Sequence, residues 1–129
     1  NLQQIQAYLH LPEYIQQEDL PLLYENAIAF VCPSFSEGFG MPVIECMACG
    51  TPVITSNITS LPEIAGNAAI LVDPYNHAEI GNAIQQLVTQ PELVERLKLL
   101  GLQNVKRFNW ENTVAETLKV YQSILNENK

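Results

Sequence analysis

Two glutamates eight positions apart, Glu37 and Glu45, are the side chains of this 129-residue chain best placed to do chemistry. A Gly-rich stretch lies between them, in the run Ser36-Glu37-Gly38-Phe39-Gly40-Met41-Pro42-Val43-Ile44-Glu45. A carboxylate can accept hydrogen bonds from two neighbouring hydroxyls, which a sugar ring or a ribose offers. Backbone N–H groups at a helix start bind phosphate. The combination therefore predicts a site for a nucleotide-diphosphate sugar.

The elements that would position these glutamates can be predicted from the flanking sequence. Residues 28–32 form a continuous apolar run, which is typical of a strand buried on both faces of a parallel sheet. Pro42 suits the first turn of a helix, which we expect to end near Ala48 with Gly50 as a left-handed C-cap. The next strand begins at 53–55.

This order of elements is strand, Gly-rich loop, helix, strand. In such a unit the helix begins at the carboxyl edge of the sheet, where ligands bind in open α/β folds. Glu37 would lie in the loop, and Glu45 about one turn into the helix, near the same mouth. Thr59 and Ser60 follow the second strand, so we expect them to line that mouth too.

The rest of the chain predicts one α/β domain in which helices flank a parallel sheet. We expect a further strand at 69–72 and a short extended piece at 13–15. The expected helices cover 2–9, 19–26 with Asp19 as cap, 61–65, and segments starting at Asn76 or His77, at Pro91 and after Asn109. The last helix carries an apolar stripe of Val114, Leu118, Tyr121 and Leu125. Trp110, at its start, is expected to serve packing.

At these residues the sequence resembles the retaining glycosyltransferases of family 4, which have the GT-B fold. The family's E-x(7)-E motif is matched by Glu37 and Glu45. The likeness continues through 47–56, 60–66, 68–74 and 108–111, and spans roughly 18–125. The Ser-Leu-Pro-Glu and Val-Asp-Pro segments are most similar to mannosyl- or rhamnosyltransferases. The resemblance implies a Rossmann-like sheet belonging to the C-terminal, donor-binding half of a GT-B enzyme.

The resemblance also implies roles for individual residues. Glu45 would bind the ribose hydroxyls of the donor, and Glu37 would act in catalysis by contacting the transferred sugar. Backbone N–H groups would bind the sugar and the diphosphate, and they come from Gly38, Phe39, Gly40 and Met41. The parent enzyme would transfer a hexose with retention, by front-face displacement. No metal or other cofactor is expected.

The charge distribution predicts that the chain is only part of such an enzyme. Residues 1–95 contain eleven acidic and no basic side chains, although a diphosphate leaving group needs cations for its stabilisation. The family supplies an Arg and a Lys from earlier in this domain, and neither is present. We expect residues 1–129 to be a partial donor-binding domain without its N-terminal acceptor domain, inactive by itself.

Composition limits the partners that we expect. A net charge of −8 argues against nucleic acid and anionic lipid. Three cysteines, two of them in Cys46-Met47-Ala48-Cys49, are expected to be packing thiols in a reducing, cytoplasmic compartment. The acceptor, a sugar or lipid, would bind the absent domain, through which a parent can also touch the membrane peripherally.

Two alternatives to a transferase remain at this point. One is another nucleotide-sugar enzyme of similar fold, such as an epimerase or phosphorylase, which would need a catalytic histidine or a cofactor lysine. The other is a non-catalytic module that binds a sugar nucleotide or a partner. The sequence does not identify the base, the sugar or the acceptor.

Overall fold

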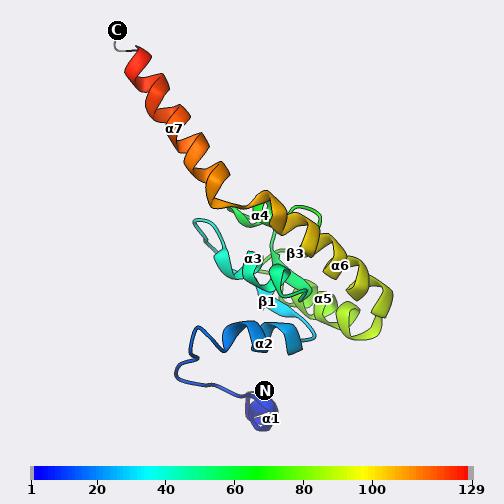
Figure 1. Cartoon of the computed structure of the whole chain (residues 1–129). Helices are drawn as coiled ribbons and strands as arrows, with labels where there is room; N and C mark the ends of the chain where they lie inside the picture. Colours follow the sequence, from blue (N-terminus) through cyan, green and yellow to red (C-terminus); the bar gives the residue numbers. More distant parts are fainter. Residues whose placement is uncertain (1, 128–129) are drawn as a thin grey trace.

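Three parallel strands form the central sheet in the order β1-β2-β3, namely β1 (Phe30–Cys32), β2 (Val53–Ser56) and β3 (Ala69–Val72) (Figure 1). The computed structural model of the chain describes residues 2–127. Phe30 pairs with Val53, and Val53 with Ala69, so the three carboxyl ends meet at one edge of the sheet. All four residues of β2 are buried, whereas Val31 of β1 is 38% exposed.

Helices flank this sheet on both faces. Their bounds are α1 (Leu2–Ile5), η1 (Gln6–Tyr8), α2 (Leu20–Asn26), α3 (Met41–Ala48), α4 (Leu61–Ala65), α5 (His77–Thr89), α6 (Pro91–Asn104), η2 (Val105–Arg107) and α7 (Trp110–Glu127). Among the described residues, no helix is long and apolar enough to cross a membrane. The α/β class, with a parallel sheet between helices, is therefore confirmed.

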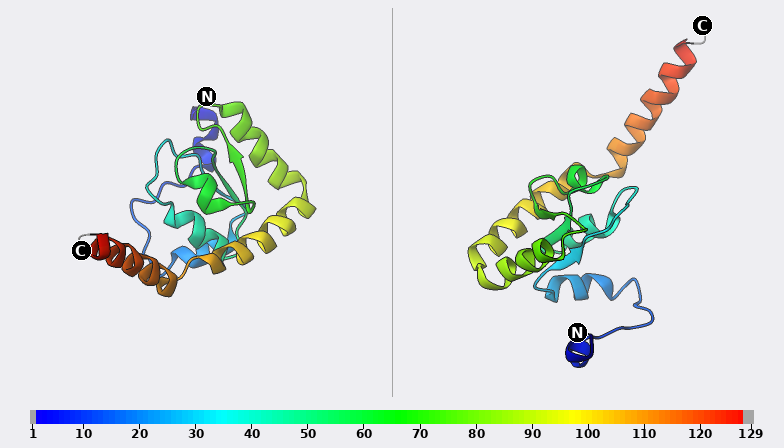
Figure 2. Two further views of the ribbon diagram at one scale, coloured as in Figure 1. Left: turned by 90° about the horizontal axis from the view of Figure 1, so that it is seen from above. Right: turned by 180° about the vertical axis from the view of Figure 1, so that it is seen from behind.

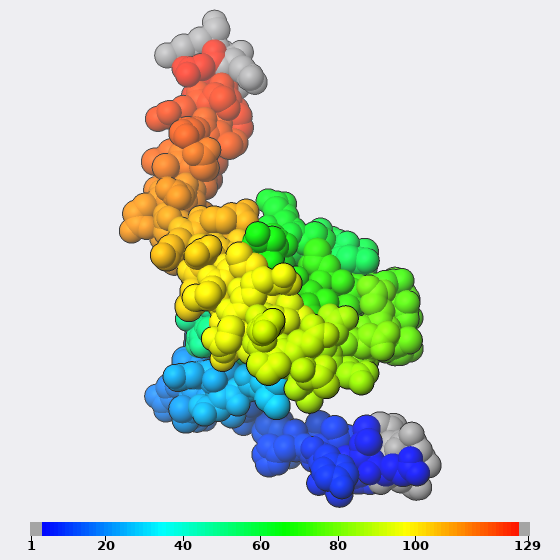
Figure 3. Space-filling model, turned by 90° about the vertical axis from the view of Figure 1, so that its right-hand side faces the viewer, coloured from blue at the N-terminus to red at the C-terminus, as the bar shows by residue number. Residues whose placement is uncertain are grey.

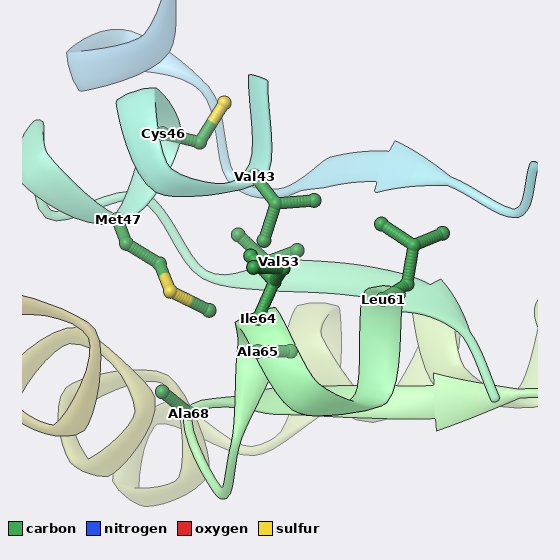
Figure 4. Close-up of a cluster of buried hydrophobic side chains, with 8 residues drawn as sticks. All are labelled: Val43, Cys46, Met47, Val53, Leu61, Ile64, Ala65 and Ala68. Atoms are coloured by element: carbon green, nitrogen blue, oxygen red, sulfur yellow. The ribbon is translucent and has the colours of Figure 1, made fainter. Parts of the chain in front are cut away.

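Side chains of β2 face two separate hydrophobic clusters. Val53 lies in the cluster formed by α3 and α4, shown as sticks in Figure 4. Ile54 points to the opposite face and packs with residues of α5 and α6. This alternation follows from the period of two in a strand, and it makes β2 the element that joins the two helical layers.

The α3 side of the core depends on small and flexible side chains. Cys46 and Met47 of α3 are fully buried, and Gly101 of α6 approaches Met47 so closely that an added Cβ would lie 3.3 Å from its side chain. Burial, with smaller contributions from Cys49, Glu45 and Cys32, raises the pKa of the Cys46 thiol to about 12. Since all three cysteines are free, the prediction of packing thiols is confirmed for the buried Cys46.

Most predicted boundaries are confirmed. Pro42 lies in the first turn of α3, which ends at Ala48, and Gly50 has a left-handed φ of 73° just after the helix. The Asn76 side chain caps α5 by accepting a hydrogen bond from the N–H of the third residue after it, at 3.2 Å. Asn109 does the same for α7 at 2.8 Å.

Four local predictions are wrong. Asp19 precedes α2 with helical φ and ψ of −87° and −19°, and its side chain makes no capping hydrogen bond. The strand expected at 28–32 is shorter and lies at the edge of the sheet, so it is not buried on both faces. The helix expected at 2–9 consists of α1 followed by the 3-10 turn η1, and 13–15 is irregular.

The last helix, α7, leaves the body of the molecule (Figures 1 and 2). In the space-filling view it is a narrow column beyond the packed helices (Figure 3). Its stripe of Val114, Leu118, Tyr121 and Leu125 is between 51% and 68% exposed. The helix is thus confirmed, while its apolar face contributes little to this core.

The buried thiol makes stability depend on alkaline pH. Because the pKa of Cys46 is raised from 9.0 to about 12, the unfolded thiol ionises first and unfolding becomes more favourable above pH 9. We expect the free-energy difference between the wild type and Cys46→Ala, measured by urea unfolding, to narrow by roughly 1 kcal/mol between pH 8.5 and 10. If the stability difference between the wild type and Cys46→Ala stays constant with pH, burial of the thiol does not raise the pKa of Cys46 as described.

Candidate functional site

The loop that joins β1 to α3 opens at the carboxyl edge of the sheet and contains most of the predicted site. Hydroxyl groups on β2 hold its first half in place. Thr55 Oγ1 donates to the carbonyl of Cys32 at 3.0 Å, and Ser56 Oγ donates to the carbonyl of Ser34 at 2.5 Å. The beginning of the loop is therefore attached to the central strand by side chains that are themselves fully buried.

Gly40 is required by the fold. It precedes the first residue of α3 with a left-handed φ of 102°, and it is buried. A Cβ added there would lie 2.7 Å from Cδ2 of Leu61, the fully buried first residue of α4. Because only glycine combines this φ with this contact, Gly40 sets the angle at which α3 leaves the loop.

Gly38 has no such structural reason. An added Cβ there would meet no atom within 4 Å, its φ is not left-handed, and the residue is exposed. A glycine that the fold does not need leaves space in front of the loop, through which a ligand can approach the backbone closely. The start of α3 is open as well, since no side chain caps it.

The two glutamates lie in different surroundings. Glu37 is half-buried in the loop, where its charge, after burial, is a cause of the raised pKa of Cys32. Glu45 is half-buried on the second turn of α3, on the side of α2. Burial raises the pKa of Tyr24, and the Glu45 carboxylate raises it further by its charge and by a hydrogen bond.

Thr59 and Ser60 belong to the segment that lies against the loop. Thr59 is exposed, and among residues 2–127 it is the one non-glycine residue with a positive φ, at 59°. The Ser60 hydroxyl lies 3.0 Å from the carbonyl oxygen of Glu37 and 3.1 Å from that of Phe39. The structure therefore brings the segment after β2 against the Gly-rich loop, as expected from their positions after neighbouring strands.

An apolar groove of ≈ 500 Å³ adjoins the loop. Its walls are Phe39, Met41 and Ile44 on one side and residues of η2 and the start of α7 on the other. Phe39 and Met41 are 43% and 52% exposed, and the Phe39 ring meets the edge of Phe108 with centroids 5.9 Å apart. Trp110 also lines this groove and is 80% exposed, so the expectation that it serves packing is wrong.

Sequence reasoning also missed an aromatic pair at the same edge. Phe35 in the loop and Tyr75 after β3 have ring centroids 4.8 Å apart, and both rings are exposed. Both residues follow the ends of strands, and this position in the sequence could have indicated that they lie at the same edge of the sheet.

A larger hollow, of ≈ 670 Å³, lies at the α5–α6 turn. Since α5 follows β3 directly and runs back along the sheet, this hollow is at the opposite edge, away from both glutamates.

Few cations lie near the site in the described part of the chain. Lys98 and Lys119 pair with Glu95 and Glu116 on their own helices. Arg107 lines the apolar groove, donating to Asn104 Oδ1 at 2.9 Å and lying 5.2 Å from the centroid of the Phe108 ring. The described residues contain no group of three His, Cys, Asp or Glu side chains that could hold a metal ion.

Comparison with known proteins assigns the chain to a family. Residues 3–101 match the family described as glycosyl transferases group 1, and the chain belongs to it. It is 44% identical over 109 residues to an O-antigen chain mannosyltransferase B of Escherichia coli, covering 84% of this chain and 29% of that protein. A D-inositol 3-phosphate glycosyltransferase of Streptomyces bingchenggensis is 36% identical over 107 residues, which cover 81% of this chain and 24% of the relative.

A solved structure shows the same architecture. The chain resembles a sucrose-phosphate synthase from Thermosynechococcus elongatus with a TM-score of 0.80 and 31% identity, over 97% of this chain and 33% of that one. The chain therefore has the fold of part of a GT-B glycosyltransferase, as its sequence predicted. It spans no more than about a third of the length of the relatives and the structure that it matches.

The two loop glycines should respond differently to the same substitution. We expect Gly40→Ala to lower the free energy of unfolding by about 1–3 kcal/mol, because it combines a left-handed φ with a clash against Leu61. Gly38→Ala, at an exposed position with free space, should change it by no more than about 0.5 kcal/mol. Urea unfolding of both variants checks this. Equal losses of unfolding free energy would contradict the close contact between Gly40 and Leu61.

Proposed function

We propose that this chain is the donor-binding part of a retaining glycosyltransferase of family 4. The whole protein would transfer a hexose from a nucleotide-diphosphate sugar to an acceptor. One observation supports this most strongly. The Gly-rich loop opens at the carboxyl edge of the sheet, with a glycine that the fold does not need at its tip and a carboxylate on each side of the α3 start.

The proposed roles follow from the positions of the groups. Glu45 accepts hydrogen bonds from the two ribose hydroxyls, and Glu37 contacts the transferred sugar, where it stabilises positive charge at the reacting carbon. The diphosphate and the sugar hydroxyls lie in front of the loop and accept from backbone N–H groups of Gly38, Phe39, Gly40 and Met41. Thr59, exposed on the segment that lies against the loop, is proposed to contact the donor as well.

Charge stabilisation of the leaving group is the part of the reaction that this chain supplies least. A helix start is equivalent to roughly half a positive charge. A departing nucleoside diphosphate carries more negative charge than that, and residues 1–95 provide no Lys or Arg. We propose that the remaining two-thirds of the parent protein provides these cations. By itself the chain would therefore bind the donor weakly and not catalyse transfer.

The mechanism proposed for the parent is front-face displacement without a metal or other cofactor. The leaving diphosphate and the incoming acceptor hydroxyl share one face of the sugar, so the anomeric configuration is retained. Two relatives are named mannosyltransferases, which makes mannose the first sugar to test. The acceptor, a sugar or a lipid, would bind the rest of the protein at the cytoplasmic face of a membrane.

One observation favours a second candidate. Lys98, Lys119 and Arg107 make contacts away from the glutamates, so the isolated chain could be a module that binds a sugar nucleotide or a partner without catalysis. An epimerase or phosphorylase is not favoured, since the family match is to glycosyl transferases. Sugar transfer by the longer protein, with the product anomer assigned by proton NMR, separates the two candidates and tests retention.

Donor binding can be tested on this chain with two matched glutamate variants. In ligand-observed NMR with GDP-, UDP- and ADP-sugars, we expect one nucleotide to bind and Glu45→Gln to weaken it about tenfold, since hydrogen bonds to a charged group contribute about 1.5–3 kcal/mol. The control is Glu92→Gln, in the larger hollow at the α5–α6 turn, which should bind normally. Loss of nucleotide-sugar binding in Glu92→Gln but not in Glu45→Gln would place the nucleotide at the opposite edge of the sheet and contradict the proposal.

A further inference from the structure

The Ser60 hydroxyl contacts two carbonyl groups of the Gly-rich loop. Its Oγ lies 3.0 Å from the oxygen of Glu37 and 3.1 Å from the oxygen of Phe39. A serine hydroxyl has one proton, so the two carbonyls share it. Ser60 is half-buried at the N-terminus of α4, and its own carbonyl accepts from Ile64 N–H at 3.0 Å. The hydroxyl is thus fixed to a packed helix rather than to another loop.

The two carbonyls belong to the peptide units that carry the N–H groups of Gly38 and Gly40. In a trans peptide the C=O and N–H bonds of one unit point in opposite directions, and residues 2–127 contain no cis peptide bond. Both carbonyls turn toward Ser60. The N–H groups of Gly38 and Gly40 must therefore turn away from Ser60.

Neither of these N–H groups has a protein partner. Within the described chain, no backbone or side-chain oxygen accepts a hydrogen bond from Gly38 N–H or Gly40 N–H. Two neighbouring backbone donors without a protein acceptor are available to the oxygens of a ligand.

The backbone just before Ser60 is held in an unfavourable conformation. Thr59 has a φ of 59°, which is rare for a residue branched at Cβ. Such a conformation persists only where the surrounding structure determines it. Leu61 is fully buried against Gly40, and β2 ends at Ser56, so the chain between them has to turn sharply to deliver Ser60 to the loop.

We propose that Ser60 is a positioning residue for donor binding. By holding the carbonyls of Glu37 and Phe39, it turns the N–H groups of Gly38 and Gly40 away from α4 and toward oxygens of the nucleotide-diphosphate sugar. The same hydrogen bond holds the backbone of Glu37 beside the transferred sugar. This inference rests on the proposed function for the identity of the ligand, but its structural part can be tested without any ligand.

The first measurement uses the ligand-free chain. We expect Ser60→Ala to shift the carbonyl ¹³C resonances of Glu37 and Phe39 upfield and to speed the exchange of the Gly38 and Gly40 amides. Ser60→Thr, which keeps the hydroxyl, should retain wild-type values. Ser123→Ala is the matched control, because it removes a serine hydroxyl bonded to the Val120 carbonyl on α7. Ser60→Gly is a second hydroxyl-free variant, suited to a helix N-cap if Ser60→Ala does not fold.

The second measurement adds the donor. The nucleotide sugar that the wild type binds should bind Ser60→Ala about tenfold more weakly and Ser60→Thr normally, with urea unfolding showing that each variant is folded under the binding conditions. Unchanged carbonyl shifts in both hydroxyl-free variants would overturn the inference, and so would normal donor binding by them. A wild type that binds no nucleotide sugar would refute the proposed ligand, while the carbonyl shifts would still decide the role of Ser60 in the loop.

Discussion

The contact between Gly40 and Leu61 is the constraint on which the site depends. It joins the loop after β1 to the first turn of α4, and it is possible only because residue 40 lacks a Cβ and adopts a left-handed φ. On one side of this contact, α3 begins and carries Glu45. On the other side, Ser60 precedes Leu61 and reaches back to the loop that contains Glu37. One buried contact thus fixes the start of α3, which carries Glu45, relative to the loop that contains Glu37.

The sequence predicted those parts of the fold that follow from local rules. Glycine and proline marked both ends of α3, and apolar runs marked β2 and β3, because turn chemistry and burial act within a few residues. The exposed side of β1, the open stripe of α7 and the exposure of Trp110 were not predicted. These features depend on which elements lie opposite, and the same apolar residues would be expected in a covered or an uncovered position.

For the candidate site, the motif from Glu37 to Glu45 predicted a glycosyltransferase, and the family match confirms that class. Sequence alone did not reveal why the two glycines differ, since Gly40 is explained by packing and Gly38 is not. It also did not reveal the Ser60 contacts, which join residues more than twenty positions apart. The binding roles of these residues stay a proposal.

Chemical-shift mapping of a ¹⁵N-labelled chain titrated with nucleotide-diphosphate sugars would test the central claim most directly. The account predicts that the amides of Gly38, Gly40 and Thr59 shift together on binding, with smaller changes along the first turns of α3. Shifts clustered at the α5–α6 turn, with the Gly-rich loop unchanged, would contradict it.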